Sequence, residues 1–456
     1  MTNFEYFKSE VLAGEDLKRS LGPIQPMIGN PKSETYVIPG AKDAKWIFDD
    51  DTILQKHILV LGAIGSGKTN CLYQLIRQIE NHMAENDKMV IFDTKGDFLK
   101  FWSKGDSVIS IDHSGPYFYE NWNIFEDVKI EESGLRTLAA DEIVSTLFQP
   151  AVEKSNNPFF PKAARDLVLA LVMQVLKESP NPTNADLKKV IFGPKQELFR
   201  LLSSDSEWSW VSDYLPKGDQ ASGVYGEIYE TMRAVLQRPF DEKGTFSIRN
   251  FVRQEGKRKL FFEYSVSTSL VLKPLYSVLY DLAIKEVLSH KKPKGRTFFI
   301  IDEFSLLPYL RYIENGINFG RERGARFVIA AQNMNQIVDI YGEYRGRSIA
   351  SGIGTFITFA LYDKLSREIV SGKYGQNVKN LLVMSKRREE GYKQNVVWGN
   401  VIEDDDLSTL KLGEAIICPP SSQPFRFNFN KYENVKSALI EDGSNDASMT
   451  SSGDHP

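Results

Sequence analysis

An eight-residue segment that follows the apolar run His57–Leu61 limits the possible folds of this chain more than any other feature. Its residues are Gly62, Ala63, Ile64, Gly65, Ser66, Gly67, Lys68 and Thr69. A strand, a glycine-rich loop and a helix start in this order form a cradle for the phosphates of a nucleotide. The glycines let backbone N–H groups turn inward, Lys68 adds a positive charge, and the Thr69 hydroxyl can bind Mg²⁺. We therefore expect these residues, with the adjoining Asn70, to bind ATP or GTP with Mg²⁺. The alternative is a glycine turn that caps a helix.

A second motif supplies carboxylates. The apolar residues 298–301 are followed directly by Asp302 and Glu303. A buried strand that ends in two acids is a Walker B pattern when it accompanies a phosphate-binding loop, although strand ends alone are often acidic. Asp302 would hold the hydration shell of Mg²⁺, and Glu303 would orient and polarise the attacking water. The pair predicts hydrolysis of the nucleotide.

Two further candidates follow this acidic pair. Gln332 comes at the end of an apolar run and is predicted to sense the γ-phosphate, unless it only satisfies loop backbone groups. Arg321 lies near the end of a predicted helix and could act as an arginine finger in the site of a neighbouring subunit. Its alternative role is that of a cation on the helix dipole.

Near-continuous apolar runs predict a parallel sheet that is covered by helices on both faces. The predicted strands are 57–61, 89–92, 107–111, 259–265, 297–301, 326–330 and 355–361, and helical patterns include 70–82 and 306–319. Between the third and fourth strands the runs are helical, at 135–148, 159–177, 184–190 and 223–236. We expect an α/β fold, doubly covered, with an inserted all-α domain. The expected parts are an N-terminal arm (1–32), a nucleotide-binding domain (33–128 and 248–436), the insertion (129–247) and a flexible tail (437–456).

Composition excludes several classes of protein. Cys71 and Cys418 are too few for a disulfide framework or a cysteine-rich metal site. The longest uncharged apolar run, Ser348–Tyr362, is shorter than the roughly 18 residues needed to span a bilayer, so we expect a soluble, cytoplasmic protein. The net charge of −4 excludes a broadly basic coat for nucleic acid, but it does not exclude a local basic channel. Three basic clusters, 257–259, 291–296 and 386–388, are candidate DNA contacts, and each could also be an ordinary solvated face.

Several segments, in their order and spacing, resemble the conjugative coupling ATPases of type IV secretion, the TraD, TrwB and TraG group, which belong with FtsK and HerA among RecA-like hexameric DNA pumps. The likeness runs from about residue 53 to residue 427 and is weakest in the helical insertion. Besides the phosphate-binding loop, it is carried by 57–60, 92–98, 246–251, 301–304, 320–324, 331–333, 341–342 and 351–359.

The resemblance implies a RecA-like P-loop NTPase fold, a homo-hexamer when active, and an all-α insertion that meets DNA. It implies that Arg321 is the finger, with Arg323 as a substitute, and that Gln332 is the sensor. Asp93 matches an acid of the family, yet it could equally fix the turn at Lys95. Family members usually begin with transmembrane helices that this chain lacks, so we expect either a soluble relative, held at the inner face of the membrane by a partner, or a protein that works away from a membrane.

The main hypothesis is an ATPase that translocates DNA, or a nucleoprotein, toward a secretion or conjugation channel, without sequence preference. One alternative is a nucleotide-gated receptor that recruits a relaxase or effector protein, with hydrolysis only resetting it. A second is a HerA-like DNA-processing or defence translocase that works with a separate nuclease. A motor should hydrolyse ATP faster with DNA, whereas a receptor should respond to its protein cargo.

Overall fold

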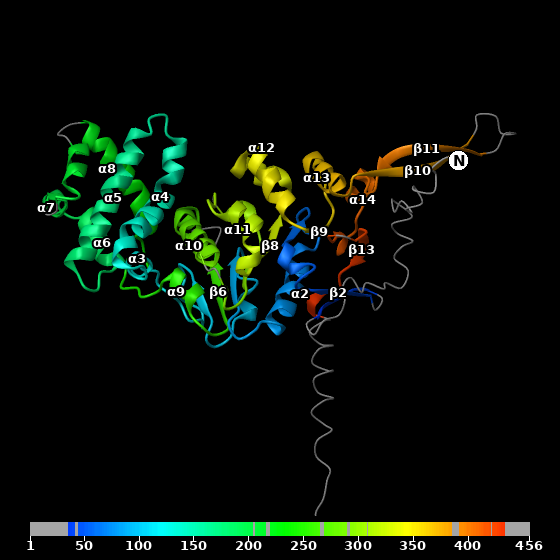
Figure 1. Cartoon of the computed structure of the whole chain (residues 1–456), viewed down its shortest axis with the longest axis horizontal. Coiled ribbons are helices and arrows are strands. Elements are labelled where there is room, and N and C mark those ends of the chain that lie inside the picture. Colours follow the sequence, from blue (N-terminus) through cyan, green and yellow to red (C-terminus); the bar gives the residue numbers. More distant parts are fainter. Residues whose placement is uncertain are drawn as a thin grey trace, which may run out of the picture. The chain divides into compact units, whose positions relative to one another are not determined.

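The computed structural model describes residues 35–41, 44–203, 206–215, 219–264, 269–289, 292–307, 309–384, 392–420 and 422–433 (Figure 1). The predicted arm and tail lie outside these residues. By their contacts, the residues form two units. The phosphate-loop unit comprises Met1–His82, Asp302–Phe304 and Phe327–Pro456, and the insertion unit comprises Met83–Ile301 and Ser305–Arg326. The predicted domain limits stay predictions.

The phosphate-loop unit is built on five strands in the order β13-β12-β9-β3-β8. They are β3 (Ile58–Leu61), β8 (Ala325–Ala331, whose first two residues group with the other unit), β9 (Thr355–Thr358), β12 (Glu414–Cys418) and β13 (Phe425–Asn428). Strand β3 is parallel to both β8 and β9, whereas β12 is antiparallel to β9 and β13. Every residue of β3, β8 and β9 is buried, which explains why these strands are mostly apolar, although β8 contains Arg326 and β9 begins and ends with threonine.

Helices and two small hairpins complete this unit. The helices are α2 (Lys68–Asn81), α12 (Met334–Gly352), α13 (Lys364–Tyr374), α14 (Asp404–Ser408) and the 3₁₀ turns η3 (Leu54–Lys56) and η7 (Phe304–Leu306). The hairpins are β1 (Thr35–Pro39) with β2 (Lys45–Asp49), and β10 (Gln376–Met384) with β11 (Tyr392–Asn400). Within α12 the backbone breaks at Gly342, whose φ of 76° is accessible to glycine at little cost.

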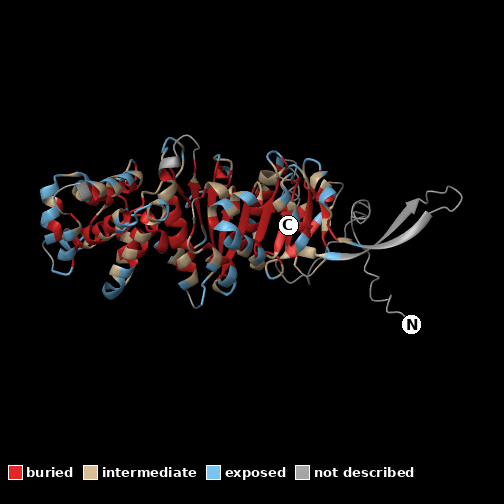
Figure 2. Cartoon of the chain, turned by 90° about the horizontal axis from the view of Figure 1, so that it is seen from above, coloured by how far each residue is buried: buried red, intermediate tan, exposed pale blue. Residues whose placement is uncertain are grey.

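The insertion unit contains four parallel strands in the order β7-β4-β6-β5. They are β4 (Lys88–Asp93), β5 (Ser107–Ile109), β6 (Arg258–Glu263) and β7 (Thr297–Ile301). Between β5 and β6 the regular elements of the described residues are all helical. The α-helices are α3 (Ile124–Lys129), α4 (Arg136–Lys154), α5 (Phe159–Glu178), α6 (Asn184–Phe192), α7 (Lys195–Ser203), α8 (Asp219–Val235) and α9 (Ile248–Arg253). Figure 2 shows their inner faces buried. The unit also holds α10 (Ser269–Ser289), α11 (Ile313–Phe319) and the 3₁₀ turns η4 (Leu99–Phe101), η5 (Ser133–Leu135), η6 (Ser209–Tyr214) and η8 (Arg321–Arg323).

The predicted continuous helix 306–319 is wrong, because only its second half, α11, is an α-helix. The backbone before α11 makes its hydrogen bonds elsewhere. The buried carboxylate of Asp281 on α10 accepts from the N–H groups of Arg311 (2.9 Å) and Tyr312 (3.1 Å), and Ser277 donates to the carbonyl of Tyr309 (2.9 Å). Pro308 also disfavours a helical residue before it.

Candidate nucleotide-binding site

The phosphate-binding loop joins β3 to α2 in a shape that only glycine accommodates. Gly65 and Gly67 have φ values of 73° and 118°, in the left-handed region. A Cβ atom at Gly62 would lie 2.6 Å from Cβ of Phe359, and one at Gly67 would lie 3.3 Å from Cα of Gly413. Gly67 precedes α2 and makes no side-chain cap. The first N–H groups of α2 are therefore available to an anion.

The polar side chains of the loop differ in how far they are satisfied. The Lys68 ammonium donates to the carbonyls of Gly62 (2.6 Å) and Ala63 (3.1 Å), so it folds over the loop. The Ser66 hydroxyl donates to Ala63 (2.8 Å) and is buried. The half-buried Thr69 hydroxyl makes no hydrogen bond with any other described residue. The loop thus presents a cation that is held over its own carbonyls and a hydroxyl that is open to a ligand.

Gln332 lies beside this loop. Leu61 of β3 pairs with Ala331 of β8 in parallel register, so Gln332 and Gly62 follow neighbouring strands at the same level. Asn333 caps α12 by accepting from the N–H of Gln336 (3.0 Å), which fixes the backbone. The half-buried Gln332 amide itself makes no hydrogen bond to the part of the chain that the structure describes, so the alternative role in loop support finds no counterpart there.

The acidic pair follows β7, whose five residues are all buried. Asp302 is buried and Glu303 is half-buried. Together with Phe304 they group with the phosphate-loop unit. The buried Phe304 ring stacks on Tyr341 of α12 at 5.5 Å between centroids, which anchors the pair in that unit.

These residues fit a magnesium nucleotide. Among the described residues no three His, Cys, Asp or Glu side chains converge on a point, so the protein offers no complete cage for a metal there. Mg²⁺ does not need one, because it keeps several waters and is usually held by one or two protein oxygens and the phosphates. The Thr69 hydroxyl and the Asp302 carboxylate match that requirement.

The side chain of Asn70 makes hydrogen bonds with a segment that is far away in the sequence, and its predicted role in nucleotide binding stays a prediction. Its amide N–H donates to the carbonyl of Asn430 (2.9 Å) and its amide oxygen accepts from the N–H of Tyr432 (2.8 Å). Gln74 also donates to Asn430 (2.6 Å), and the Tyr73 and Tyr432 rings lie 5.4 Å apart. The structure therefore places Asn70 against the C-terminal segment, a contact that no local pattern could reveal.

Asp93 has the structural environment that its alternative role requires. The fully buried carboxylate accepts from the N–H groups of Lys95 (3.2 Å), Asp97 (3.0 Å) and Phe98 (2.8 Å). Gly96 provides the left-handed residue of this turn, with φ of 73°. These contacts explain the acid without nucleotide chemistry.

Arg321 and Arg323 lie far along the sheet from Gln332. Both belong to η8, which ends just before β8, while Gln332 comes just after it. Seven residues at about 3.3 Å each separate the two ends of β8 by roughly 23 Å. Arg321 is exposed and Arg323 is half-buried. The two arginines group with the insertion unit, whereas Gln332 groups with the phosphate-loop unit.

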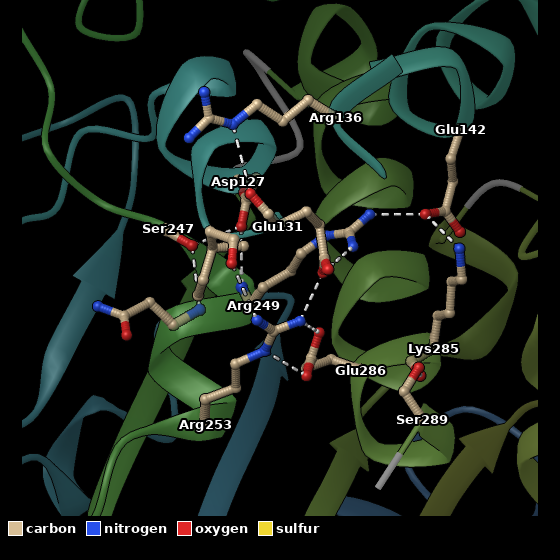
Figure 3. A network of polar contacts seen from close by, with 12 residues as sticks. Asp127, Glu131, Arg136, Glu142, Ser247, Arg249, Arg253, Lys285, Glu286 and Ser289 are labelled. Atoms are coloured by element: carbon tan, nitrogen blue, oxygen red, sulfur yellow. Dashed lines mark hydrogen bonds and ion pairs between the residues drawn. The ribbon is translucent and has the colours of Figure 1, made fainter. Parts of the chain in front are cut away.

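The segment 246–251 has a structural explanation in the insertion unit (Figure 3). The buried Arg249 guanidinium contacts Glu131 (3.2 Å) and Glu142 (2.6 Å). Burial raises the pKa of Asp127, which nevertheless accepts from the Ser247 hydroxyl (2.6 Å) and the Arg249 N–H (2.9 Å). The motif thus joins α9 to α3, α4 and the turn between them.

Helix α10 joins the same network. Arg253 contacts Glu131 and Glu286, each at 2.6 Å, and Lys285 contacts Glu142 at 2.6 Å. Sequence reasoning identified the segment only by resemblance, because its partners are more than 100 residues away.

In two of the basic clusters, some residues form ion pairs with acidic residues elsewhere in the chain. Lys259 is buried against Asp106 (3.2 Å), and Arg296 contacts Asp87 (2.7 Å). Lys294 pairs with Glu255 at the surface (2.8 Å). The cluster 386–388 lies outside the described residues. These pairs leave less free charge for DNA than the sequence suggested.

A phosphate-binding loop and a carboxylate pair on mostly parallel strands with helices make up a RecA-like P-loop fold, as predicted. The family model for the type IV secretion-system coupling protein DNA-binding domain matches residues 51–399. The chain belongs to this family. No curated protein matches it.

Solved structures agree with the fold. The conjugative coupling protein TrwBdeltaN70 in complex with sulphate has a TM-score of 0.71 at 19% identity, covering 92% of this chain and 93% of that one. TrwB with the GTP analogue GDPNP has a TM-score of 0.70 at 19% identity, with 92% of each chain covered. VirB4 of Thermoanaerobacter pseudethanolicus reaches 0.54 at 12% identity, over 88% of this chain and 98% of that one. No helix among the described residues is long and apolar enough to cross a membrane.

Proposed function

We propose that this chain is an ATPase that moves DNA through the centre of a homo-hexamer. The observation that carries the proposal is the set of polar groups that the fold leaves open beside the phosphate-binding loop. The half-buried Thr69 hydroxyl and Gln332 amide make no hydrogen bond with another described residue, and the start of α2 has no side-chain cap. Groups left open in this way are suited to a ligand.

Each residue has a distinct task in this proposal. The backbone N–H groups of the loop and the Lys68 ammonium hold the phosphates, and Thr69 and Asp302 hold Mg²⁺. Bound Mg²⁺ would neutralise charge on the phosphate oxygens. Glu303 orients a water molecule and takes its proton, and Gln332 contacts the γ-phosphate or this water. Solved structures of TrwB are complexes with GDPNP, with ADPNP, and with ADP and Mg²⁺.

Arg321 is proposed to act on the nucleotide of a neighbouring subunit. The coupling-protein family supports this role, because Arg321 stands at the position that the resemblance assigns to the finger. Arg323 is the substitute candidate. We expect Arg321→Ala subunits mixed with Lys68→Ala subunits to recover ATPase activity, since each supplies what the other lacks. No recovery at any ratio, with Arg323→Ala tested in parallel, would leave both arginines without a role in trans.

The proposed setting is the cytoplasm, with attachment to the inner face of the membrane through a partner such as a secretion-channel protein. A relaxase bound to the transported DNA is the proposed cargo partner. The coupling-protein family supports this setting, and no observation favours the receptor or the defence translocase over it.

The deciding experiment measures ATPase rate against protein concentration, with single-stranded DNA, double-stranded DNA or neither. A hexameric motor should hydrolyse ATP more rapidly per subunit at higher concentration and with DNA. Glu303→Gln should bind ATP and lose turnover, and serves as the control for contaminating ATPases. A rate that ignores DNA but rises with a relaxase would support the receptor instead. Absence of hydrolysis at every concentration would remove the motor proposal.

A further inference from the structure

Three aromatic rings on α6 and α8 form a stacked series that the nucleotide site does not use. Helix α6 contacts both α7 and α8 in the insertion unit (Figure 1). The rings of Phe192 and Tyr229 stack at 5.6 Å with an interplanar angle of 24°. Tyr229 and Tyr225 stack at 6.0 Å and 23°. The Lys195 ammonium lies 4.3 Å from the centre of the Tyr225 ring. We call these four residues the aromatic ladder.

The ladder runs from the core to the surface. Tyr225 is 5% exposed and Tyr229 is half-buried, whereas Phe192 is 39% exposed. A single exposed phenylalanine is ordinary on a protein surface. This one differs because the stacked tyrosines hold its ring in place and keep it parallel to theirs. A flat, rigid and partly exposed ring at the end of a stack can be extended by another flat ring.

The face around Phe192 carries positive charge. Lys189 lies one turn before Phe192 on α6, and Arg233 lies one turn after Tyr229 on α8, so both share the face of the ladder. Arg233 has no ion-pair partner within the described ranges. Lys188, also on this face, is paired with Asp241.

Acidic residues do not cancel this charge. By helical periodicity, Glu227 and Glu230 lie away from the Tyr229 face of α8. Glu197 on α7 lies near Lys189, but it forms its ion pair with Arg200 at 2.8 Å. The ladder face is therefore aromatic and cationic, the combination that binds single strands through base stacking and phosphate contacts.

We propose that the Phe192 end of the ladder stacks on an unpaired base of a single-stranded nucleic acid, while Lys189, Lys195 and Arg233 contact its phosphates. The inference deepens the proposed DNA-moving function, on which it rests. A protein partner would need a contiguous apolar patch of a few hundred Å², whereas the residues that flank Phe192 on the α6 face, Lys188 and Lys189, are charged. A duplex would hide its base faces, so the ladder is specific to unpaired bases.

The test compares a labelled oligothymidine with an abasic oligomer of the same length, using fluorescence anisotropy and the full chain. Wild-type protein should bind the oligothymidine more tightly than the abasic oligomer. Phe192→Ala should weaken oligothymidine binding about 5- to 100-fold and leave abasic binding unchanged, because stacking supplies the difference. Phe192→Trp should restore binding. Oligouridine should behave like oligothymidine, because stacking does not read the sugar.

Phe199→Ala is the matched control, since Phe199 is 38% exposed on the adjacent α7 and stacks on no ring in the described structure. It should leave both affinities unchanged. Lys189→Ala and Arg233→Ala should weaken both oligomers alike, and each should reduce the salt dependence by about one phosphate contact.

Two results would overturn the inference. One is an equal loss of oligothymidine and abasic binding in Phe192→Ala. The other is no loss in that variant at all. Failure of the motor proposal is separable, because it would appear in wild-type protein as absent ATP hydrolysis, and Phe192→Ala should retain the basal ATPase rate measured without nucleic acid.

Discussion

The phosphate-binding loop and the Arg249 network use polar residues in opposite ways. Around the loop, the Thr69 hydroxyl and the Gln332 amide have no described partner, and the start of α2 has no side-chain cap. Around Arg249, cations and carboxylates are paired at short distances, although Nε of Arg249 and one carboxylate oxygen of Glu142 are buried without a hydrogen-bond partner among the described residues. Both segments resemble family motifs in the sequence. On the proposed function, the open groups of the loop serve a ligand, whereas the paired groups around Arg249 hold helices together.

The largest expected effect is the loss of ATPase activity on substitution of Lys68. Lys68→Ala should lower the ATPase rate by at least about 100-fold, because a charge that stabilises the transferred phosphoryl group is lost. The melting temperature should barely change, since the ammonium is on a half-buried side chain and donates to carbonyls of the loop itself. Steady-state ATPase and circular dichroism measure the two effects. A variant that hydrolyses ATP normally would contradict the open-site interpretation.

Substitution of Arg249 should lower the stability of the protein, whereas substitution of Lys68 should lower its activity. Arg249→Met should lower the free energy of unfolding by about 3 kcal/mol, because the buried Glu142 and the half-buried Glu131 would each lose one cation. Urea denaturation measures the loss. The control is Arg200→Met, whose contacts with Glu178 and Glu197 are exposed, so its removal should leave the unfolding midpoint nearly unchanged. Equal effects of the two variants would refute the assignment of stability to the buried network.

The buried carboxyl of Asp281 should make the stability of the insertion unit depend on pH. Burial raises the pKa of this carboxyl to about 7, despite two backbone hydrogen bonds that favour its charged form. The folded state therefore binds more protons than the unfolded state between about pH 4 and 7, and stability must fall as pH rises in that range.

The expected slope from this group is at most about 1.4 kcal/mol per pH unit, and it should vanish above pH 7. Urea unfolding of wild-type protein and Asp281→Asn at pH 5, 6, 7 and 8 isolates the contribution as a difference between the two proteins. A difference that does not change with pH would show that the carboxyl has an ordinary pKa in the folded protein.

The smallest effect is expected at Asn70, which belongs to the loop motif but has paired polar groups. Asn70→Ala should cost about 1–2 kcal/mol of stability through the lost contacts with Asn430 and Tyr432. Nucleotide affinity, measured by calorimetry, should fall little. Asn70→Asp should be intermediate, because it keeps the acceptor and loses the donor. A large loss of affinity without a loss of stability would instead make Asn70 a nucleotide ligand.

Much of the fold followed from short-range patterns. Buried strands such as β3 and β8 are continuous apolar runs, and the helical stretch between β5 and β6 has helical periodicity. The hairpins were not predicted. The missed helix α10 is apolar on nearly all sides, which conceals its period. The error at 306–312 arose because its backbone bonds to α10 rather than to itself.

For the candidate site, the sequence by itself determined the loop, its lysine and threonine, and the acidic pair, because each is a run of neighbouring residues whose chemistry depends on local spacing. Only the tertiary structure decided which polar groups are paired. It joined Asn70 to Asn430 across 360 residues and Arg249 to Glu142 across 107, and it set Gln332 level with Gly62 through strand register. Contacts between distant residues depend on how the chain folds back on itself, and no local pattern of residues encodes that path.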